Sequence, residues 1–364
     1  MRTMSLYFFL EGSEMKQSTA LSFFLGANSA SGFYSLYDQF CCGKSDYLYI
    51  IKGGPGTGKS TFMRRIGTEA EQRGLDVEYI FCSGDPDSLD GVYIPALRKG
   101  WVDGTTPHAQ EPKLFGISGE YMDLGRFCNK DSLQAKRDEI TVLQSKYKKH
   151  YDHAYNFLHA AGAIFRYVPE TLSPLEETKL RKRAQSKIIR ELRKTDTQSD
   201  PSVRFLRAFT CKGCSFTPDT VNSLCSRICV LQSDYLLENI FFHEILQEIT
   251  LRKIPCIISP NPLCPDMIEA ILLPQDGLGF FASYAVPEFR GIVRTIHLDS
   301  YLSIKDHHPL KQKQQILHTL MARAYDELAN AKALHDQLEV YYRPALDTKA
   351  LNQYTDDAIS KLFS

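Results

Sequence analysis

The chain has 364 residues, which is enough for two domains of ordinary size or one large α/β domain. It carries 43 basic and 43 acidic side chains, so the composition gives no case for nucleic acid as the main partner. With 43% hydrophobic and 24% charged residues, it matches a globular protein and excludes a disordered or fibrous chain. No apolar run approaches the roughly 20 residues of a membrane span, so we expect no membrane partner.

Ten cysteines are too few for a disulfide-built fold, which favours a reduced, cytoplasmic location. Cys211 and Cys214 form a CxxC pair, and Cys225 and Cys229 follow at a spacing loosely typical of zinc sites. Cys229 lies within an apolar run, where a free cysteine packs as a small hydrophobic side chain. We therefore expect these cysteines to lie in the core, with a zinc site as the alternative.

The strongest motif follows an apolar run at 47–51 that predicts a β-strand. Residues 53–60 satisfy the pattern GxxxxGK[ST], whose glycines let successive backbone N–H groups point at phosphate oxygens. A helix predicted from residue 62 onward would add the positive end of its dipole. We expect Lys59 to reach the β- and γ-phosphates, Ser60 to bind Mg²⁺ and Thr61 to contact the α-phosphate. The expected nucleotide-binding residues are Gly53, Gly54, Pro55, Gly56, Thr57, Gly58, Lys59, Ser60 and Thr61.

A site of this kind needs a carboxylate at the end of a neighbouring strand to complete the Mg²⁺ shell. Asp103 follows a short apolar approach and precedes turn residues, so we predict that it shares Mg²⁺ with Ser60 and acts with Lys59 in catalysis. Other downstream carboxylates are Asp85, Asp87 and Asp90. Their cluster, after the strand predicted at 77–82, suits either a second loop at the ligand edge of the sheet or a solvated turn.

Several other residues are compatible with more than one role in the expected reaction. His108 is either a phosphate contact or proton carrier, or a structural side chain beside Pro107. Asn129-Lys130-Asp131 resembles a guanine-reading motif but places its Asp one position early, so we do not expect guanine specificity. No Glu follows Asp103 as a catalytic base, which predicts slow intrinsic turnover. The cations available for charge stabilisation are Arg64, Arg65, Arg98 and Arg126.

The chain also repeats itself at a spacing of roughly 180 residues. The matching segments are 24–27 with 205–208, 50–52 with 230–232, 86–95 with 265–274, 122–124 with 296–298, and 167–169 with 342–344. Their common order indicates a duplication, so we expect two α/β halves. The same alignment gives Cys211 and Cys214 the positions of Ala30 and Phe33, which also favours core packing over zinc.

The second half has lost the motif. Residues 233–240 contain no glycine, and Asn239 stands at the position of Lys59. The position of Asp103 falls at Ala282. Because Asp234 and Glu238 would also repel a triphosphate, we expect this half to bind no nucleotide.

Helical patterns follow each predicted core, at 131–165, 309–342 and 349–363. Ser173 to Glu176 forms a capping box that predicts a further helix, with an apolar stripe and a basic remainder over 179–194. The basic helix suits a solvated amphipathic helix, a lid over the glycine-rich loop, or a surface for RNA or another acidic partner. We expect each half to be a core followed by a helical hairpin.

These motifs resemble a family of poorly characterised bacterial P-loop ATPases of the Firmicutes type, built from two tandem P-loop halves. The segments that carry the resemblance are 32–35, 51–61, 85–91 and 103–108, within a similarity covering most of 20–165 and, more loosely, 203–345. The resemblance implies ATP binding. In such proteins the second half commonly keeps its own glycine-rich loop, and this chain departs from that pattern at 233–240.

The sequence therefore predicts an α/β fold with a duplicated, P-loop NTPase-like parallel sheet flanked by helices. We expect a P-loop domain with a helical extension at 1–200 and a degenerate repeat with C-terminal helices at 201–364. The expected function is Mg²⁺-dependent ATP binding and hydrolysis at one site in the first half. Two alternatives stay open: a kinase for a small molecule or nucleotide, with the basic helix as its lid, and an ATP-gated binding module with little turnover.

Overall fold

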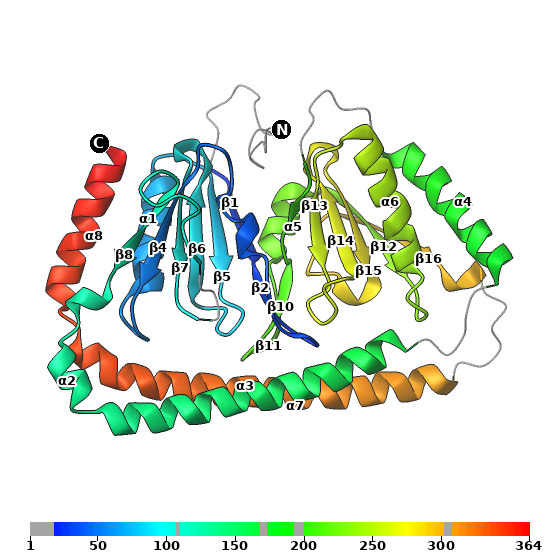
Figure 1. Cartoon of the computed structure of the whole chain (residues 1–364). Coiled ribbons are helices and arrows are strands. Elements are labelled where there is room, and N and C mark those ends of the chain that lie inside the picture. Colours follow the sequence, from blue (N-terminus) through cyan, green and yellow to red (C-terminus); the bar gives the residue numbers. More distant parts are fainter. Residues whose placement is uncertain (1–17, 107–109, 168–172, 193–199, 302–307) are drawn as a thin grey trace.

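The computed structural model describes residues 18–106, 110–167, 173–192, 200–301 and 308–364, to which all structural statements below refer. Two six-stranded sheets lie side by side, each covered by helices, and two long helices run along one end of both sheets (Figure 1). The predicted α/β class is confirmed. None of the helices in the described ranges has the length and apolar content that a membrane crossing requires.

The first sheet contains the strand that leads into the glycine-rich motif. Its strands, in spatial order, are β1 (Ala20–Phe24), β5 (Val77–Phe81), β6 (Leu89–Ile94), β7 (Lys99–Asp103), β4 (Tyr47–Lys52) and β8 (Gly119–Asp123). Strand β6 runs antiparallel to both neighbours, so the sheet is mixed and mostly parallel, and the predicted parallel sheet is confirmed only in part. The reason is the short turn η3 (Pro95–Leu97) between β6 and β7, since a parallel pair needs a crossover of about a dozen residues or more.

The second sheet has the same strand order. Its strands are β9 (Ser202–Val203), β13 (Ile257–Pro260), β14 (Ile268–Leu273), β15 (Leu278–Ala282), β12 (Arg227–Gln232) and β16 (Ile292–His297). Strand β14 is antiparallel to its neighbours, as β6 is in the first sheet. Each half also has a hairpin: β2 (Gly26–Ser29) with β3 (Gly32–Ser35), and β10 (Arg207–Thr210) with β11 (Gly213–Phe216). Their turn glycines, Gly32 and Gly213, share φ values of 92° and 91°.

Corresponding helices follow β4 and β12, each of which is the second strand from the outer edge of its sheet. Helix α1 (Lys59–Gln72) follows β4 and buries Phe62, Met63 and Ile66 in the core of the first half. Helix α6 (Glu238–Arg252) follows β12 and buries Phe241, Phe242 and Ile245 in the second core. The short helix α5 (Pro218–Leu224) packs on β1, and so joins the second half to the edge of the first sheet.

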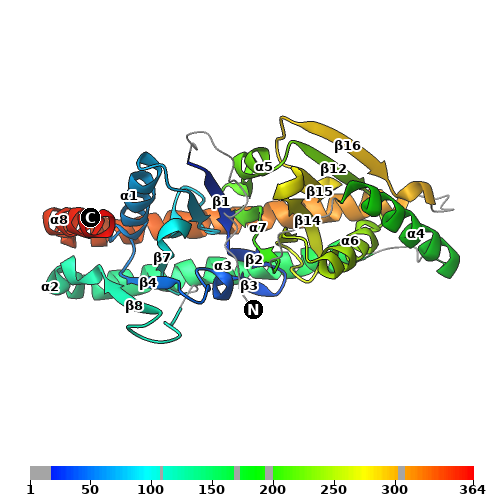
Figure 2. The ribbon, with the colours of Figure 1, turned by 90° about the horizontal axis from the view of Figure 1, so that it is seen from above.

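The two longest helices join the halves. After the short helix α2 (Lys130–Gln134), α3 (Arg137–Arg166) spans about 45 Å, and α7 (His308–Tyr342) about 52 Å, at 1.5 Å per residue. They lie side by side and run in opposite directions (Figures 1 and 2). Their shared core includes Ala154, Leu158 and Ala161 of α3 with Ala324 and Leu328 of α7, and its small side chains allow close approach. The expected helical hairpin within each half is therefore wrong, because α3 pairs with α7 instead.

The remaining helices are exchanged between the halves. Helix α4 (Pro174–Glu191), from the first segment, packs on α6 of the second sheet, where Leu180 and Ala184 are fully buried. Helix α8 (Thr348–Phe363), from the end of the chain, packs on α1 of the first sheet (Figure 1). The predicted capping box is confirmed: the Glu176 carboxylate accepts a 2.9 Å hydrogen bond from the Ser173 backbone N–H. Each sheet is thus covered in part by helices from the other segment of the chain.

Candidate functional site

The glycine-rich loop (residues 53–58) joins the carboxyl end of β4 to the amino end of α1. Strand β4 lies between β7 and β8 and runs parallel to both, so three strands end at the same edge of the sheet. Gly56 and Gly58 have φ values of 67° and 84°, a region that side chains with a Cβ disfavour. A loop of this form before a helix presents its backbone N–H groups to an anion.

Lys59 and Asp103 come together as the sequence predicted. Asp103 is the last residue of β7 and pairs in register with Ile51, so its carboxylate emerges beside the loop. Its Oδ2 lies 3.6 Å from the Lys59 Nζ, while Oδ1 accepts hydrogen bonds from the N–H and hydroxyl of Thr105 at 2.9 and 2.7 Å. Lys59 also donates to the carbonyl oxygens of Gly53 and Gly54, at 3.0 Å each.

The hydroxyl residues of the motif differ in their surroundings. Thr57 is buried, and its hydroxyl donates to the Gly54 carbonyl oxygen at 2.8 Å, so it stabilises the loop itself. Ser60 lies in the first turn of α1, where its Oγ accepts a 2.9 Å hydrogen bond from the Leu89 N–H. Thr61 is exposed at the end of a hollow between α1 and α8. A serine hydroxyl and an aspartate carboxylate are oxygen donors of the kind that a hard cation such as Mg²⁺ prefers.

The acidic cluster at 85–90 is not a simple solvated turn, because each of its carboxylates has a partner in the fold. The buried carboxylate of Asp90 accepts a 2.9 Å hydrogen bond from the Tyr37 hydroxyl. Asp87 pairs with Lys212, and Asp85 lies 3.3 Å from the Nζ of Lys332. Two of the three carboxylates therefore meet lysines from the second half of the chain. His108 lies outside the described residues.

Three of the four arginines considered from the sequence make other side-chain contacts, and the fourth, Arg98, lies in a turn. Arg64 donates to the Asp87 carbonyl oxygen at 2.9 Å, and Arg65 pairs with Asp356 of α8. Arg98 follows η3 with a φ of 52°, at the turn between β6 and β7. Arg126 stacks over Tyr354 of α8, with its guanidinium carbon 4.4 Å from the ring centroid.

The carboxyl end of α7 lies directly on the glycine-rich loop. A Cβ added to Gly54 would overlap the ring of Tyr342, and one added to Gly56 would lie 3.3 Å from the Glu339 side chain. The next segment is tied to the first half by backbone hydrogen bonds from Asn129 N–H to the Ala345 carbonyl oxygen, at 2.7 Å, and from Asp347 N–H to the Phe127 carbonyl oxygen, at 2.9 Å. The second segment thus forms one wall of the candidate site.

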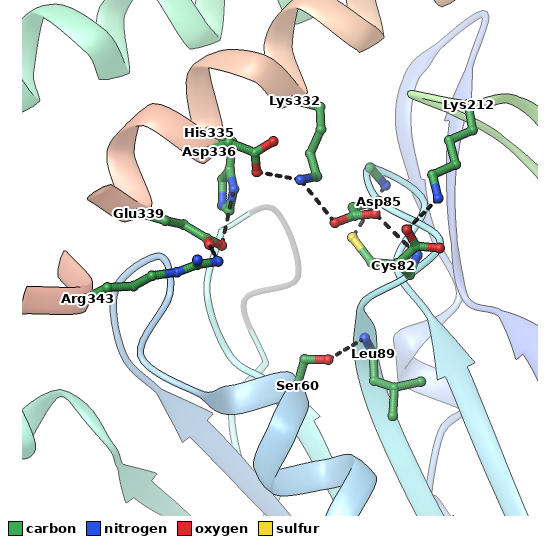
Figure 3. Close-up of polar contacts among 12 residues, drawn as sticks. Ser60, Cys82, Asp85, Leu89, Lys212, Lys332, His335, Asp336, Glu339 and Arg343 are labelled. Atoms are coloured by element: carbon green, nitrogen blue, oxygen red, sulfur yellow. Dashed lines mark hydrogen bonds and ion pairs between the residues drawn. The ribbon is translucent and has the colours of Figure 1, made fainter. Parts of the chain in front are cut away.

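This wall carries a set of ionisable residues that we call the charged face of α7. Its members are Lys332, His335, Asp336 and Glu339 of α7, together with Arg343, the first residue of the short turn η8 (Arg343–Ala345) that follows the helix. Figure 3 shows Lys332, His335 and Glu339 reaching from α7 toward the loop and toward Asp85, with Ser60 across the intervening space. Asp336 pairs with Lys332, and Glu339 pairs with Arg343. Sequence reasoning missed these residues, although their spacing of three and four positions puts them on one side of a helix.

His335 differs from the rest of the charged face. Its Nδ1 is buried and has no hydrogen-bond partner among the described residues, and the Glu339 Oε1 lies 3.7 Å away. Burial lowers the pKa of the imidazole, and the nearby charge of Lys59 lowers it further, against the opposing effect of Glu339. His335 is therefore held as a neutral imidazole, which can accept a proton or orient a water molecule.

In the second half, the loop that corresponds to the glycine-rich loop forms hydrogen bonds with Asp299 of the same half. The Ser233 hydroxyl donates to Asp299 Oδ1 at 2.6 Å, and the Asp234 N–H donates to Oδ2 at 2.9 Å. Leu236 keeps the left-handed backbone of Gly56, with a φ of 57°. Burial raises the pKa of Glu238 to about 8, and its carboxylate oxygens have no hydrogen-bond partner in the described ranges. Ala282 ends β15 opposite Leu231, as predicted for the counterpart of Asp103.

Two groups of side chains in the described part of the chain have donor atoms close enough to share a metal ion, and neither contains a cysteine. One is His150, His153 and Glu327, between α3 and α7, and the other is His335, Asp336 and Glu339. The Cys214 Sγ accepts a 3.4 Å hydrogen bond from Arg207, and Cys225 and Cys229 are buried. These cysteines pack in or beside the core, as expected.

Comparisons of the chain with protein-family models, with curated proteins and with solved structures gave no match. The class that the fold defines is an α/β protein with two mixed, mostly parallel sheets flanked by helices.

Proposed function

We propose that the chain is a P-loop nucleoside triphosphatase that binds ATP with Mg²⁺ at residues 53–61 and hydrolyses it at this one site. The observation that carries the proposal is the meeting of Lys59, the glycine-rich loop and Asp103 at the carboxyl edge of the first sheet. The loop N–H groups and Lys59 would bind the phosphates, because both present positive charge where the phosphate oxygens would lie.

The donor atoms present fit Mg²⁺. Ser60 and Asp103 would hold it, and the ion would supply positive charge to the β- and γ-phosphate oxygens. The present contacts of Lys59 with the Gly53 and Gly54 carbonyl oxygens are ones it can exchange for a phosphate, since neither is a buried ion pair.

We further propose that the two halves arose by duplication and that the second has lost its nucleotide site. The matching strand orders, the reversed strands β6 and β14, and the paired hairpin turns support a common origin. The loss is supported by the Ser233 and Asp299 hydrogen bonds that fill the second loop, and by the buried Glu238. We accordingly expect one nucleotide per chain.

A second candidate function, an ATP-gated module with little turnover, is favoured by one observation. Helix α7 touches the glycine-rich loop at its carboxyl end, and Ala324 and Leu328, near its middle, pack with α3 and with side chains of the second half. A change at the loop could therefore move the second half.

The proposed lid role of the basic helix is wrong, because α4 packs on α6, where Arg181 and Gln185 hydrogen bond to Glu244. Residues 193 and 194 of that basic segment lie outside the described residues.

The test is Mg²⁺-dependent ADP release by the purified protein, combined with binding of a non-hydrolysable ATP analogue. Lys59→Ala should abolish both, since it removes the cation closest to the phosphates. Asn239→Ala, the matched change in the second half, should leave both unchanged. Binding by Lys59→Ala at wild-type affinity, or two nucleotides per chain, would contradict the proposal. Tight binding without ADP release would support the gated module instead.

A further inference from the structure

The charged face of α7 lies against the glycine-rich loop. Glu339 lies beside Gly56, and Lys332 reaches Asp85 on the loop after β5, so the face spans the space above Ser60 (Figure 3). A triphosphate seated in the loop would extend its terminal phosphoryl group into this space, because Lys59 and Ser60 mark its floor. The residues of α7 are therefore placed to act on the group that is transferred.

The existing pairs show which groups are available there. Glu339 is paired with Arg343 and Asp336 with Lys332, so each of these carboxylates already has a cationic partner. The His335 Nδ1 has no hydrogen-bond partner among the described residues and is closed to bulk solvent. An imidazole nitrogen with a free lone pair is the natural acceptor for a proton from water.

Lys332 is the cation best placed for the terminal phosphoryl group. It lies between Asp85 and Asp336, and so carries one positive charge against two negative ones. Burial lowers the pKa of Lys332, but Asp336 and Asp85 raise it by more, so Lys332 stays protonated. A phosphoryl oxygen can replace one of these carboxylates without leaving a buried charge unpaired.

We propose that α7 completes the site, with His335 orienting and deprotonating the attacking water and Lys332 neutralising the terminal phosphoryl group. This inference rests on the proposed function. The water oxygen forms a bond to the γ-phosphorus while the bond from that phosphorus to the bridging oxygen breaks. The electron pair of the broken bond stays on ADP, and the water proton passes to His335 Nδ1, which releases it to solvent when the products leave the site. Hydrolysis at the first half thus requires a helix from the second.

The experiment measures turnover and binding of a non-hydrolysable ATP analogue separately, in the full chain with Mg²⁺. His335→Ala and Lys332→Ala should each lower the turnover number about 100-fold, the size expected for one proton acceptor or one charge-stabilising group. Analogue affinity should stay within about threefold, because the loop and Lys59 supply the binding. Lys332→Arg should recover most of the loss. His318→Ala, an exposed histidine on the same helix, serves as the matched control and should behave as the wild type.

The pH dependence of turnover distinguishes a role of His335 in proton transfer from a purely structural role, because a structural role would leave this dependence unchanged. The groups facing His335 are Glu339, Lys332 and Asp336 on its own helix, Lys59 at the start of α1, and the Tyr147 ring of α3. With its pKa below 6.5, protonated His335 should stop turnover at acidic pH. The Gln variant (H335Q) can still orient water but cannot take its proton, so it should keep partial turnover and lose this acid limb.

The outcomes separate this inference from the proposed function. Wild-type turnover in both Ala variants, alongside its loss in Lys59→Ala, would overturn the role of α7 and leave the triphosphatase standing. Loss of analogue binding in folded Ala variants would also overturn it, because the residues would then serve binding. A wild type that binds no analogue, or binds it without turnover, would overturn the inference together with hydrolysis.

Discussion

The backbones of Phe24 and Phe205 hydrogen bond to each other in both directions. The Phe24 N–H donates to the Phe205 carbonyl oxygen at 2.9 Å, and the Phe205 N–H donates to the Phe24 carbonyl oxygen at 3.0 Å. These residues hold equivalent places in the two halves, just before the hairpins β2–β3 and β10–β11. A reciprocal pair of equivalent residues is what a two-fold relation between two units produces, so the halves meet as a symmetric dimer does.

Asn28 should be a principal stabiliser of this junction. Its buried amide donates to the carbonyl oxygens of Ser83, at 3.1 Å, and Phe209, at 2.8 Å, and accepts a 3.0 Å hydrogen bond from the Tyr155 hydroxyl. Asn28→Ala should lower the free energy of unfolding by about 3 kcal/mol, because it leaves buried groups without partners. Tyr155→Phe removes one of the three bonds and should cost about 1 kcal/mol. Equal losses in chemical denaturation would contradict this assignment.

Arg204 and Glu78 form a buried ion pair across the same junction, with 2.6 Å between Nε and Oε1 and side chains 9% and 3% exposed. Arg204→Met should cost about 3–5 kcal/mol, because it strands a buried carboxylate. Adding Glu78→Leu should recover part of that loss. A double-mutant cycle in urea measures the coupling, and simple additivity of the two changes would show that the residues do not stabilise each other.

The stability cost of replacing Gly54 should depend on the side chain of Tyr342. Gly54 does not have a positive φ, so its backbone tolerates alanine, and the obstacle to a Cβ there is the Tyr342 ring. Gly54→Ala should therefore displace the end of α7 and lower the melting temperature, and Tyr342→Ala in the same chain should remove most of that sensitivity. Gly58→Ala is the control: its φ of 84° makes the cost conformational, so Tyr342→Ala should not relieve it.

Glu238 should give the protein a pH-dependent stability. The pKa of its carboxyl is 4.5 in an ordinary setting and about 8 in the fold, mainly through burial and then through Asp299 and Asp234, against Lys313. Between these pH values the folded protein keeps a proton that the unfolded chain has lost, so the free energy of unfolding falls as pH rises. Glu238→Gln should lie near the wild type at pH 5 and exceed it by about 4–5 kcal/mol above pH 8, at about 1.4 kcal/mol for each pKa unit. Parallel pH curves for the two proteins would refute this role.

Local patterns predicted the elements that local residues determine. The strand before residue 53, the helix after it and the meeting of Lys59 with Asp103 all follow from one stretch of sequence and from strands that end at one edge. The capping box of Ser173 and Glu176 formed as expected, because it needs only residues within one helical turn. Strand direction was harder, since a fully buried run such as 89–94 looks the same whichever way it points.

The charged face of α7 could not be predicted in the same way. An amphipathic pattern specifies which side of a helix is buried but does not identify the element that covers it. The pairing of α3 with α7 could therefore not be predicted from the sequence. The contact of Tyr342 with Gly54 joins residues far apart in the chain and depends on how both halves pack. The basic helix illustrates the same limit: its apolar stripe at Leu180 and Ala184 was correct, yet it covers α6 and not the glycine-rich loop.

The exchange of α4 and α8 has a consequence for how the protein is made. During synthesis the first sheet and its glycine-rich loop leave the ribosome well before α8, and the delay at usual elongation rates is on the order of tens of seconds. Throughout that interval Phe62 lacks its stacking partner Tyr354. The nascent chain therefore exposes the apolar surface of α1 that α8 later covers. The core of the first sheet is completed only when the last helix of the chain has been made.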